Sequence, residues 1–346
     1  MDEYDLSVII CAHNPRLAYL QRVLEALRTQ TLSKTQWELL LIDNASGDPL
    51  EPRIDLSWHP SARHIRQEEL GLTSARLRGI KESQAELLVF VDDDNVLAAN
   101  YLSAALELAR SYPLVGAFGG SIVGEYETEP PDWAQPQLGS LAIIDVEKEH
   151  WALLPGTKSL VAAPAGAGLV IRREAAVYYM ERAVNDSLRH GLDRKGMSLI
   201  SSGDSDMVLC ACALGLAIGR FPQLRMTHLI PSARLERNYF LRLHEAQVFS
   251  HAILVYIWDA RLPVVEQKPC RSERLLRSYQ AWRMRLRGEA VKEKKITFED
   301  ELNEAARRGL VKALQVLQAH QKALPVGIND KFLEVDFPDA DAENQP

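Results

Sequence analysis

A short apolar run that leads directly into three carboxylates constrains this chain more than any other stretch. Leu88–Val91 is rich in β-branched and aromatic side chains and predicts a buried strand, and Asp92, Asp93 and Asp94 follow at its end. Adjacent carboxylates repel one another, and burying them without a partner is costly. A hard cation such as Mg²⁺ or Mn²⁺ is one suitable partner. The alternative is a solvated acidic turn in which Asp94 caps the next helix.

Two strands are predicted upstream, with a helical pattern between them. They cover Leu6–Cys11 and Glu38–Ile42. A strand, a helix and a strand in this order form a βαβ unit and therefore a parallel sheet, whose ligands bind at the carboxyl edge. Ala12 and Asn14 follow the first strand at that edge, and Asp43 follows the second. Asp43 is placed to accept hydrogen bonds from a base or ribose; the alternative is an Asx turn that closes the loop.

Three further positions carry an open alternative. Arg76 lies where a loop enters a helix, and either pairs with a diphosphate or is an ordinary ion-paired side chain. Trp133 lies in a long loop, 125–139, of the kind that often forms a functional lid; it either stacks on a sugar or anchors the loop. Gly168 precedes a strand and indicates a close approach to the backbone.

A second acidic cluster precedes an apolar helix in the second half of the chain. Asp204 and Asp206 lie in the stretch 201–206 with several serines, just before Met207–Leu214. One capping side chain suffices for a helix, so one of the two carboxylates is free to face a substrate.

The composition is that of a globular protein, with 47% hydrophobic and 25% charged residues among 346. The net charge of -7 argues against broad nucleic-acid binding. Four cysteines without metal-ligand spacing indicate a reducing compartment. The amino terminus does not resemble a signal peptide, and the apolar run 252–258 is too short to span a bilayer, so a cytoplasmic protein is expected.

The chain changes character after residue 235. We expect a nucleotide-binding domain over 1–235, a helical extension over 236–325 and an acidic, partly disordered tail over 326–346. The segment 263–297 is basic with apolar residues at helical spacing. It either lies peripherally on the inner face of an anionic membrane or is a solvated face packed on the domain.

Several motifs, taken together, resemble an inverting family 2 glycosyltransferase of the bacterial surface-polysaccharide type. The resemblance covers roughly residues 6–235 and leaves the helical remainder outside it. The departures from the family pattern are Cys11, His13, Leu77 and Gly203, the last in place of the first acid of an ED-x-D/E motif. The matching stretches, in chain order, are Ser7–Asn14, Leu41–Ser46, Gly71–Ile80, Phe90–Asp94, Gly203–Met207 and the pair His228 and Arg234.

The resemblance implies the α/β GT-A fold, with a mostly parallel central sheet flanked by helices and a C-terminal helical extension. It implies transfer of a sugar from a UDP-, GDP- or dTDP-linked donor to a hydroxyl of a glycan or lipid-linked acceptor, assisted by Mn²⁺ or Mg²⁺. Asp204 would be the general base, with Asp206 as the competing assignment. The implied donor-binding residues are Ala12, Asn14, Asp43, Arg76, Asp92 and Asp93; the metal ligands are Asp94, Asp92 and His228; the acceptor or lid residues are Trp133, Gly168, Asp206 and Arg234.

Three other functions compete with this interpretation. A catalytically inactive nucleotide-sugar-binding or scaffold protein is disfavoured by the acid at Asp204. A nucleotidyltransferase would carry a glycine- and lysine-rich phosphate loop, and Ile10–Asn14 has neither residue type. An NAD-dependent oxidoreductase would carry a glycine fingerprint, and the glycines around Gly168 lack its spacing.

Overall fold

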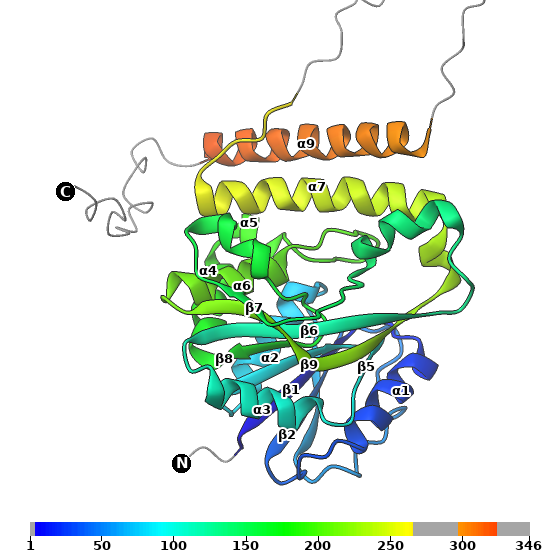
Figure 1. The fold of residues 1–346 in the computed structure, drawn as a ribbon, viewed down its shortest axis with the longest axis vertical. Helices are drawn as coiled ribbons and strands as arrows, with labels where there is room; N and C mark the ends of the chain where they lie inside the picture. Colours follow the sequence, from blue (N-terminus) through cyan, green and yellow to red (C-terminus); the bar gives the residue numbers. More distant parts are fainter. Residues whose placement is uncertain (1–3, 266–296, 324–346) are drawn as a thin grey trace, which may run out of the picture.

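The computed structural model describes residues 4–265 and 297–323. Within them, one central sheet carries helices on both faces, and two long helices stack outside one of these layers (Figure 1). The strands are β1 (Leu6–Ala12), β2 (Trp37–Asn44), β3 (Ala62–Gln67), β4 (Leu87–Asp92), β5 (Asn95–Leu97), β6 (Val115–Tyr126), β7 (His150–Ala152), β8 (Leu169–Arg172) and β9 (Ala217–Ile230). The helices are α1 (Leu17–Arg28), α2 (Leu72–Glu82), α3 (Tyr101–Ser111), α4 (Arg173–Asn185), α5 (Ser187–His190), α6 (Gly203–Ala213), α7 (Arg237–Asp259) and α9 (Phe298–Ala323).

The strand order is β3-β2-β1-β4-β8-β6-β9-β5, with β7 paired to β9. The half built from β1 to β4 is parallel, as the βαβ pattern predicts. The other half is mixed, because β8 runs antiparallel to both β4 and β6 while β6 and β9 are parallel. The expected α/β fold, with a central sheet flanked by helices, is confirmed; the described strands are parallel from β3 to β4 and in the β6–β9 pair, and antiparallel at the other pairings.

The alternation of side chains along the central strands builds two separate cores. In β1, Val8 and Ile10 face the layer of α1 and α3, whereas Ile9 faces α2, α4 and α6. Both faces are covered, so the strand is apolar almost throughout, as is typical of buried parallel strands. This burial on both faces fixes the register and carries the polar strand ends to one common edge.

Three strands were not predicted from the sequence. β3 has only one fully buried side chain, Ile65, and no regular apolar alternation. β5 is three residues long, and β7 is an exposed edge strand. β9 is one long strand, since a register shift opposite Gly119 and Ser121 lets it continue past Pro222.

The helical extension is a pair of helices that run in the same direction (Figure 1). Arg237 pairs with Glu301 near the start of α7 and α9, and Glu245 pairs with Arg308 and Lys312 further along. The basic segment expected at 263–297 and the acidic tail at 326–346 lie almost entirely outside the described residues. No helix of the described part is both long and apolar enough to cross a bilayer.

Candidate functional site

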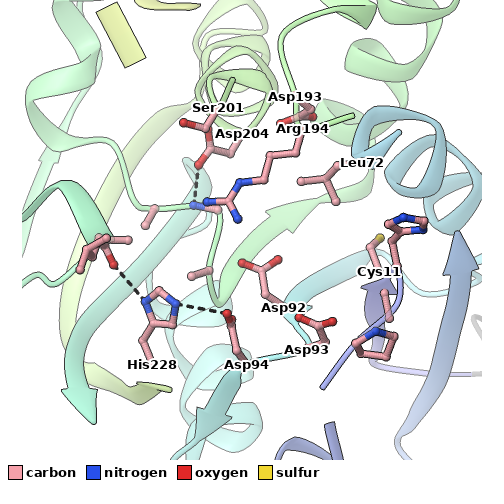
Figure 2. Close-up of a pocket in the computed structure, with 18 of the residues that line it drawn as sticks. Cys11, Leu72, Asp92, Asp93, Asp94, Asp193, Arg194, Ser201, Asp204 and His228 are labelled. Carbon is pink, nitrogen blue, oxygen red and sulfur yellow. Dashed lines mark hydrogen bonds and ion pairs between the residues drawn. The ribbon is translucent and has the colours of Figure 1, made fainter. Parts of the chain in front are cut away.

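A cleft of about 580 Å³ opens at the carboxyl edge of β1 and β4. Its floor is the end of these strands, and its walls come from the loop 193–205, the segment 139–142 and the first turns of α7. The extension therefore contributes directly to the cleft, through Tyr239, Leu243 and Gln247. Figure 2 shows the acidic groups of the cleft facing one another across it.

The three aspartates form the turn between β4 and β5. Asp92 is the last residue of β4, and Asp93 and Asp94 connect it to β5. Strand alternation ends at Asp92, and all three residues line the cleft. Asn95 holds the turn closed, since its Oδ1 accepts from the Asp92 amide at 3.2 Å and its Nδ2 donates to Asp94 Oδ1 at 3.0 Å.

Pairing of β5 with β9 brings His228 and Arg234 to this turn. Asn95 lies opposite His228 in the register. Asp94 Oδ2 lies 3.0 Å from Arg234 Nη2 and 3.4 Å from His228 Nε2. Arg234 Nη1 also donates to His228 Nε2 at 3.0 Å, so the imidazole carries its proton on Nδ1 and donates it to the Leu141 carbonyl.

The three carboxylates are electrostatically unequal. Burial raises the pKa of Asp92, and repulsion by Asp94 adds to it. Burial, together with the charges of Asp94 and Asp92, likewise raises the pKa of Asp93. Burial alone would raise the pKa of Asp94 too, but His228 and Arg234 outweigh it and hold that pKa below its usual range. Asp94 is therefore the carboxylate that ionises most readily, whereas ionisation of Asp92 and Asp93 is opposed by burial and by the charge of Asp94.

A metal would find suitable ligands here, although no ready-made cage exists. Among residues 4–265 and 297–323, no three His, Cys, Asp or Glu side chains converge to hold an ion by themselves. Mg²⁺ and similar ions are commonly bound by one or two carboxylates and completed by substrate phosphates. Asp92 and Asp94 fit that pattern. The Nδ1–H bond to Leu141 gives His228 the tautomer that ligation needs, but its Nε2 lone pair accepts from Arg234, which would have to release it before His228 bound a metal.

Asp204 faces the acidic turn from the other side of the cleft. It lies in the first turn of α6 and lines the cleft. Its Oδ2 accepts from the Gly166 amide at 2.8 Å, and its Oδ1 accepts from the Ser205 amide at 2.7 Å. These bonds orient the carboxylate while leaving it in contact with the cleft (Figure 2).

Asp206 does not line the cleft, so its position does not support the acceptor or lid role expected for it, which stays a prediction. Its side chain is fully buried. Oδ1 accepts from Arg189 and, at 2.7 Å, from Trp258 Nε1. Burial raises the pKa of Asp206, against the charge of Arg189. Of the two acids that the sequence left open, only Asp204 lines the cleft; Asp206 links α6 to α7.

Arg76 lines the cleft, but its guanidinium is already engaged. It is 5% exposed, and its Nη1 donates to both oxygens of Asp193 at 2.9 and 3.0 Å. Burial alone would lower the pKa of Arg76, but the charges of Asp193, Asp204 and Asp92 outweigh it and raise that pKa. Arg76 is therefore a buried, paired cation at the back of the cleft.

Arg194 is the cation that extends into the cleft. Figure 2 shows its side chain between Asp204 and Asp92. Within the described part of the chain, no protein group forms a hydrogen bond or ion pair with its guanidinium, which lines the cleft and is only partly buried. An arginine in this state is free to bind an incoming anion.

The remaining donor-side residues differ in their access to the cleft. Ala12 and Asn14 line it, and Asn14 adopts φ 46° with its Oδ1 accepting from the Gly47 amide at 2.9 Å. Asp43 does not line it. Its carboxylate accepts from the amides of Ser46 and Leu50 and pairs with Arg66 at 2.8 Å, which closes the loop after β2. Contact of Asp43 with a nucleotide base stays a prediction.

Trp133 and Gly168 have structural roles, so their assignment to an acceptor site or lid is not supported. Trp133 packs edge-on against Phe240 and Phe298, with ring centroids 5.8 and 5.0 Å away, which anchors its segment to α7 and α9. Gly168 has φ +69°, and a Cβ there would meet Tyr101 Oη at 2.7 Å. Neither residue lines the cleft.

Sequence reasoning missed Asn95, Gly166, Asp193 and Arg194. Asn95 directly follows the acidic run, and Gly166 belongs to the small-residue turn before β8. Asp193 and Arg194 lie in a loop with no apolar periodicity, ten residues before the second acidic cluster. The one sequence signal that could have indicated Asp193 and Arg194 is that they are adjacent, oppositely charged and close to the second acidic cluster.

Comparison with known proteins shows what the chain is similar to. A mannosyltransferase from Pyrobaculum calidifontis, solved in complex with GDP-Man and Mn²⁺, superposes with a TM-score of 0.50 at 16% identity, over 92% of this chain and 76% of that one. This likeness shows the fold: the chain has the α/β GT-A fold that its motifs predict. Residues 7–163 match the model of the family described as Glycosyl transferase family 2.

Two proteins of Bacillus subtilis (strain 168) are similar in sequence to part of the chain. The putative glycosyltransferase EpsH is 27% identical over 156 residues, which are 44% of this chain and 42% of that protein. The minor teichoic acid biosynthesis protein GgaB is 26% identical over 161 residues, which are 44% of this chain and 17% of that protein. The match thus spans less than half the length of either relative.

Proposed function

We propose that the protein transfers a sugar, with inversion, from a nucleotide-diphosphate sugar to an acceptor hydroxyl, and that Asp204 is the general base. The observation that carries this proposal is the placement of Asp204 and the acidic turn on opposite sides of one cleft, with the unpaired Arg194 between them. An inverting transfer needs this separation, because the acceptor attacks the anomeric carbon from the face opposite the leaving diphosphate.

The donor would lie along the carboxyl edge of the sheet. Its nucleoside would contact the loops after β1 and β2, where Ala12 and Asn14 line the cleft. Its diphosphate would lie between the acidic turn and Arg194, whose planar guanidinium suits a phosphate. Arg234 would stay with Asp94 and close this end of the cleft. Arg194 thus takes the diphosphate role for which Arg76 was the sequence candidate.

The chemistry is a direct displacement. Asp204 Oδ accepts the proton of the acceptor hydroxyl as that oxygen bonds to the anomeric carbon, and the bond from this carbon to the diphosphate oxygen breaks. The electron pair leaves with the nucleoside diphosphate. A divalent metal held by Asp92, Asp94 and His228 would supply Lewis-acid stabilisation of the charge on that leaving group. Mn²⁺ in the Pyrobaculum mannosyltransferase supports a divalent ion for this chain.

The acceptor would enter beside Asp204, between the segment 139–142 and α7. Tyr239 and Gln247 line the cleft on that side and offer a hydroxyl and an amide to a glycan. The naming of GgaB for teichoic acid biosynthesis supports a cell-surface glycan or lipid-linked acceptor. Peripheral contact with a membrane through 263–297 remains part of this proposal.

The competing function is that of a nucleotide-sugar-binding protein without turnover. A thermal-shift screen of UDP-, GDP- and dTDP-sugars, with and without Mn²⁺, separates the possibilities. We expect one donor to raise Tm in a metal-dependent manner, and its slow hydrolysis to release nucleoside diphosphate. A shift without hydrolysis or transfer would favour the inactive protein, and no shift with any donor would refute the proposed function.

A further inference from the structure

Gly203 occupies a place that has no room for a side chain. It begins α6, one residue before Asp204. A Cβ built on Gly203 would lie 2.1 Å from Oδ2 and 2.7 Å from Oδ1 of Asp193. The carboxylate of Asp193 therefore fills the space into which a side chain at position 203 would project. The family motif has its first acid at this position, and here a glycine replaces it.

The buried carboxylate of Asp193 has hydrogen-bond and ion-pair partners, which burial of a charged group requires. It is 7% exposed, and it accepts two bonds from Arg76 Nη1 and one of 3.0 Å from Thr73 Oγ1. Arg76 is 117 residues away in the chain and equally buried. A buried guanidinium without a carboxylate would be strongly destabilising. The fold thus requires a negative charge at this point in space, whichever residue supplies it.

Gly166 lies between the Arg76–Asp193 pair and Asp204, the proposed general base. The Gly166 amide donates to Asp204 Oδ2, and a Cβ on Gly166 would lie 2.7 Å from that oxygen and 2.9 Å from Arg76 Nη2. Gly166 is therefore wedged between Arg76 and Asp204. Because Asp193 fixes Arg76, it also fixes the backbone that orients the base.

We propose that Asp193 supplies, from the loop before α6, the carboxylate that is missing at position 203. It is a positioning residue: it does not touch substrate but holds Arg76 and, through Gly166, the carboxylate of Asp204. The proposal rests on the proposed function for its catalytic consequence. Its structural core, the pairing of Asp193 with Arg76 in the space beside Gly203, stands on the geometry of these three residues alone.

A charge-relocation experiment tests this exchange. The variants are Asp193→Ala, Gly203→Glu, the double variant that combines them, and Asp193→Ala with Gly203→Gln as an uncharged control of equal size. Asp193→Ala leaves Arg76 unpaired, and Gly203→Glu collides with Asp193. We expect each single variant to lower Tm by about 5–10 °C and kcat by at least about tenfold. The Glu double variant should recover most of both losses, and the Gln control should not.

A measurement of affinity for the donor nucleotide distinguishes a positioning role of Asp193 from a role in donor binding. Calorimetry of each folded variant with nucleoside diphosphate and Mn²⁺ should give a Kd within about twofold of the wild type, since the loss lies in the orientation of Asp204. If Asp193→Ala does not fold, Asp193→Asn takes its place, because it keeps the shape and removes the charge. Wild-type Tm and kcat in Asp193→Asn would overturn the proposal.

Additive losses in the double variant would also overturn the proposal for Asp193. If the Glu double variant is as unstable as the sum of its single variants, or if the Gln control recovers equally, the carboxylate has not been relocated. A wild-type protein that turns over no nucleotide sugar would instead refute the proposed function. The Tm comparison among the four variants would still decide the carboxylate exchange, so the two failures are distinguishable.

Discussion

The acidic turn and the loop before α6 form opposite sides of one cleft, but different forces hold them. The turn Asp92–Asp94 is fixed by backbone pairing of β4 and β5 with their neighbours. The loop is fixed mainly by side chains, above all the pair of Asp193 with Arg76, 117 residues apart. The loop also has backbone bonds, from Leu72 N to Arg194 O at 3.0 Å and from Ser202 N to Leu192 O at 2.8 Å, but loss of either member of its buried ion pair leaves an unpaired charge. The first three predictions below each act on one side and spare the other.

The largest effect is expected for Asp204→Asn. The amide cannot take the acceptor proton, so transfer should fall by roughly 10²–10⁴-fold, while donor affinity stays nearly unchanged. Steady-state kinetics and calorimetry with the donor measure the two quantities. Asp206→Asn is the matched control: it lies two residues away but away from the cleft, and should lower stability more than activity per folded molecule. Loss of donor affinity in Asp204→Asn would make Asp204 a binding residue.

The second-largest effect is expected for Arg76→Gln, which tests how the loop before α6 is held by measuring the stability of the protein. Arg76→Gln leaves Asp193 buried without its cation, and we expect the free energy of unfolding to fall by about 3–5 kcal/mol. Urea denaturation followed by circular dichroism measures it. Arg78→Gln, two residues along α2 with a half-exposed side chain paired to Glu82, should change it by less than about 1 kcal/mol. Equal effects of the two variants would contradict the assignment of Arg76 as the buried pair.

Arg194 should behave in the opposite way to Arg76. Arg194→Gln removes a free cation and no internal bond, so stability should be nearly unchanged. Charged hydrogen bonds contribute about 1.5–3 kcal/mol, so affinity for nucleoside diphosphate should fall by about 10–100-fold. Affinity for the monophosphate should fall less, because the outer phosphate is the expected partner. Arg110→Gln, on the exposed face of α3, is the control. A large loss of stability with unchanged affinity would contradict this role.

The same contrast explains what the sequence could predict. The acidic turn follows from local patterning, since an apolar strand must end at the sheet edge and Asp92, Asp93 and Asp94 are its next residues. His228 and Asp204 were reached through motif resemblance. Asp193 and Arg194 were not reached, because a loop without periodicity gives no indication of which distant side chain it meets. The contacts of Trp133 and Asp206 were not predicted, because their partners, Phe240, Phe298 and Trp258, lie on helices beyond the resemblance.

The smallest effect concerns Asp43, near the carboxyl end of β2 and outside the cleft. Burial raises its pKa, but hydrogen bonds from Ser46, Leu50 and Arg66 outweigh this and leave the pKa below its ordinary value of 3.8. A carboxyl with a lowered folded pKa stabilises the fold above its unfolded pKa, and this contribution is lost as pH falls through the folded value.

Asp43→Asn should therefore reduce the free energy of unfolding by about 1 kcal/mol at pH 7, and the difference from the wild type should shrink as pH drops below 4. Urea titrations of both proteins between pH 7 and pH 3 measure it. Donor affinity provides the second readout, since Asp43 closes its own loop and does not line the cleft. If Asp43→Asn weakens donor binding tenfold or more without any loss of stability, the carboxylate binds the nucleotide base after all.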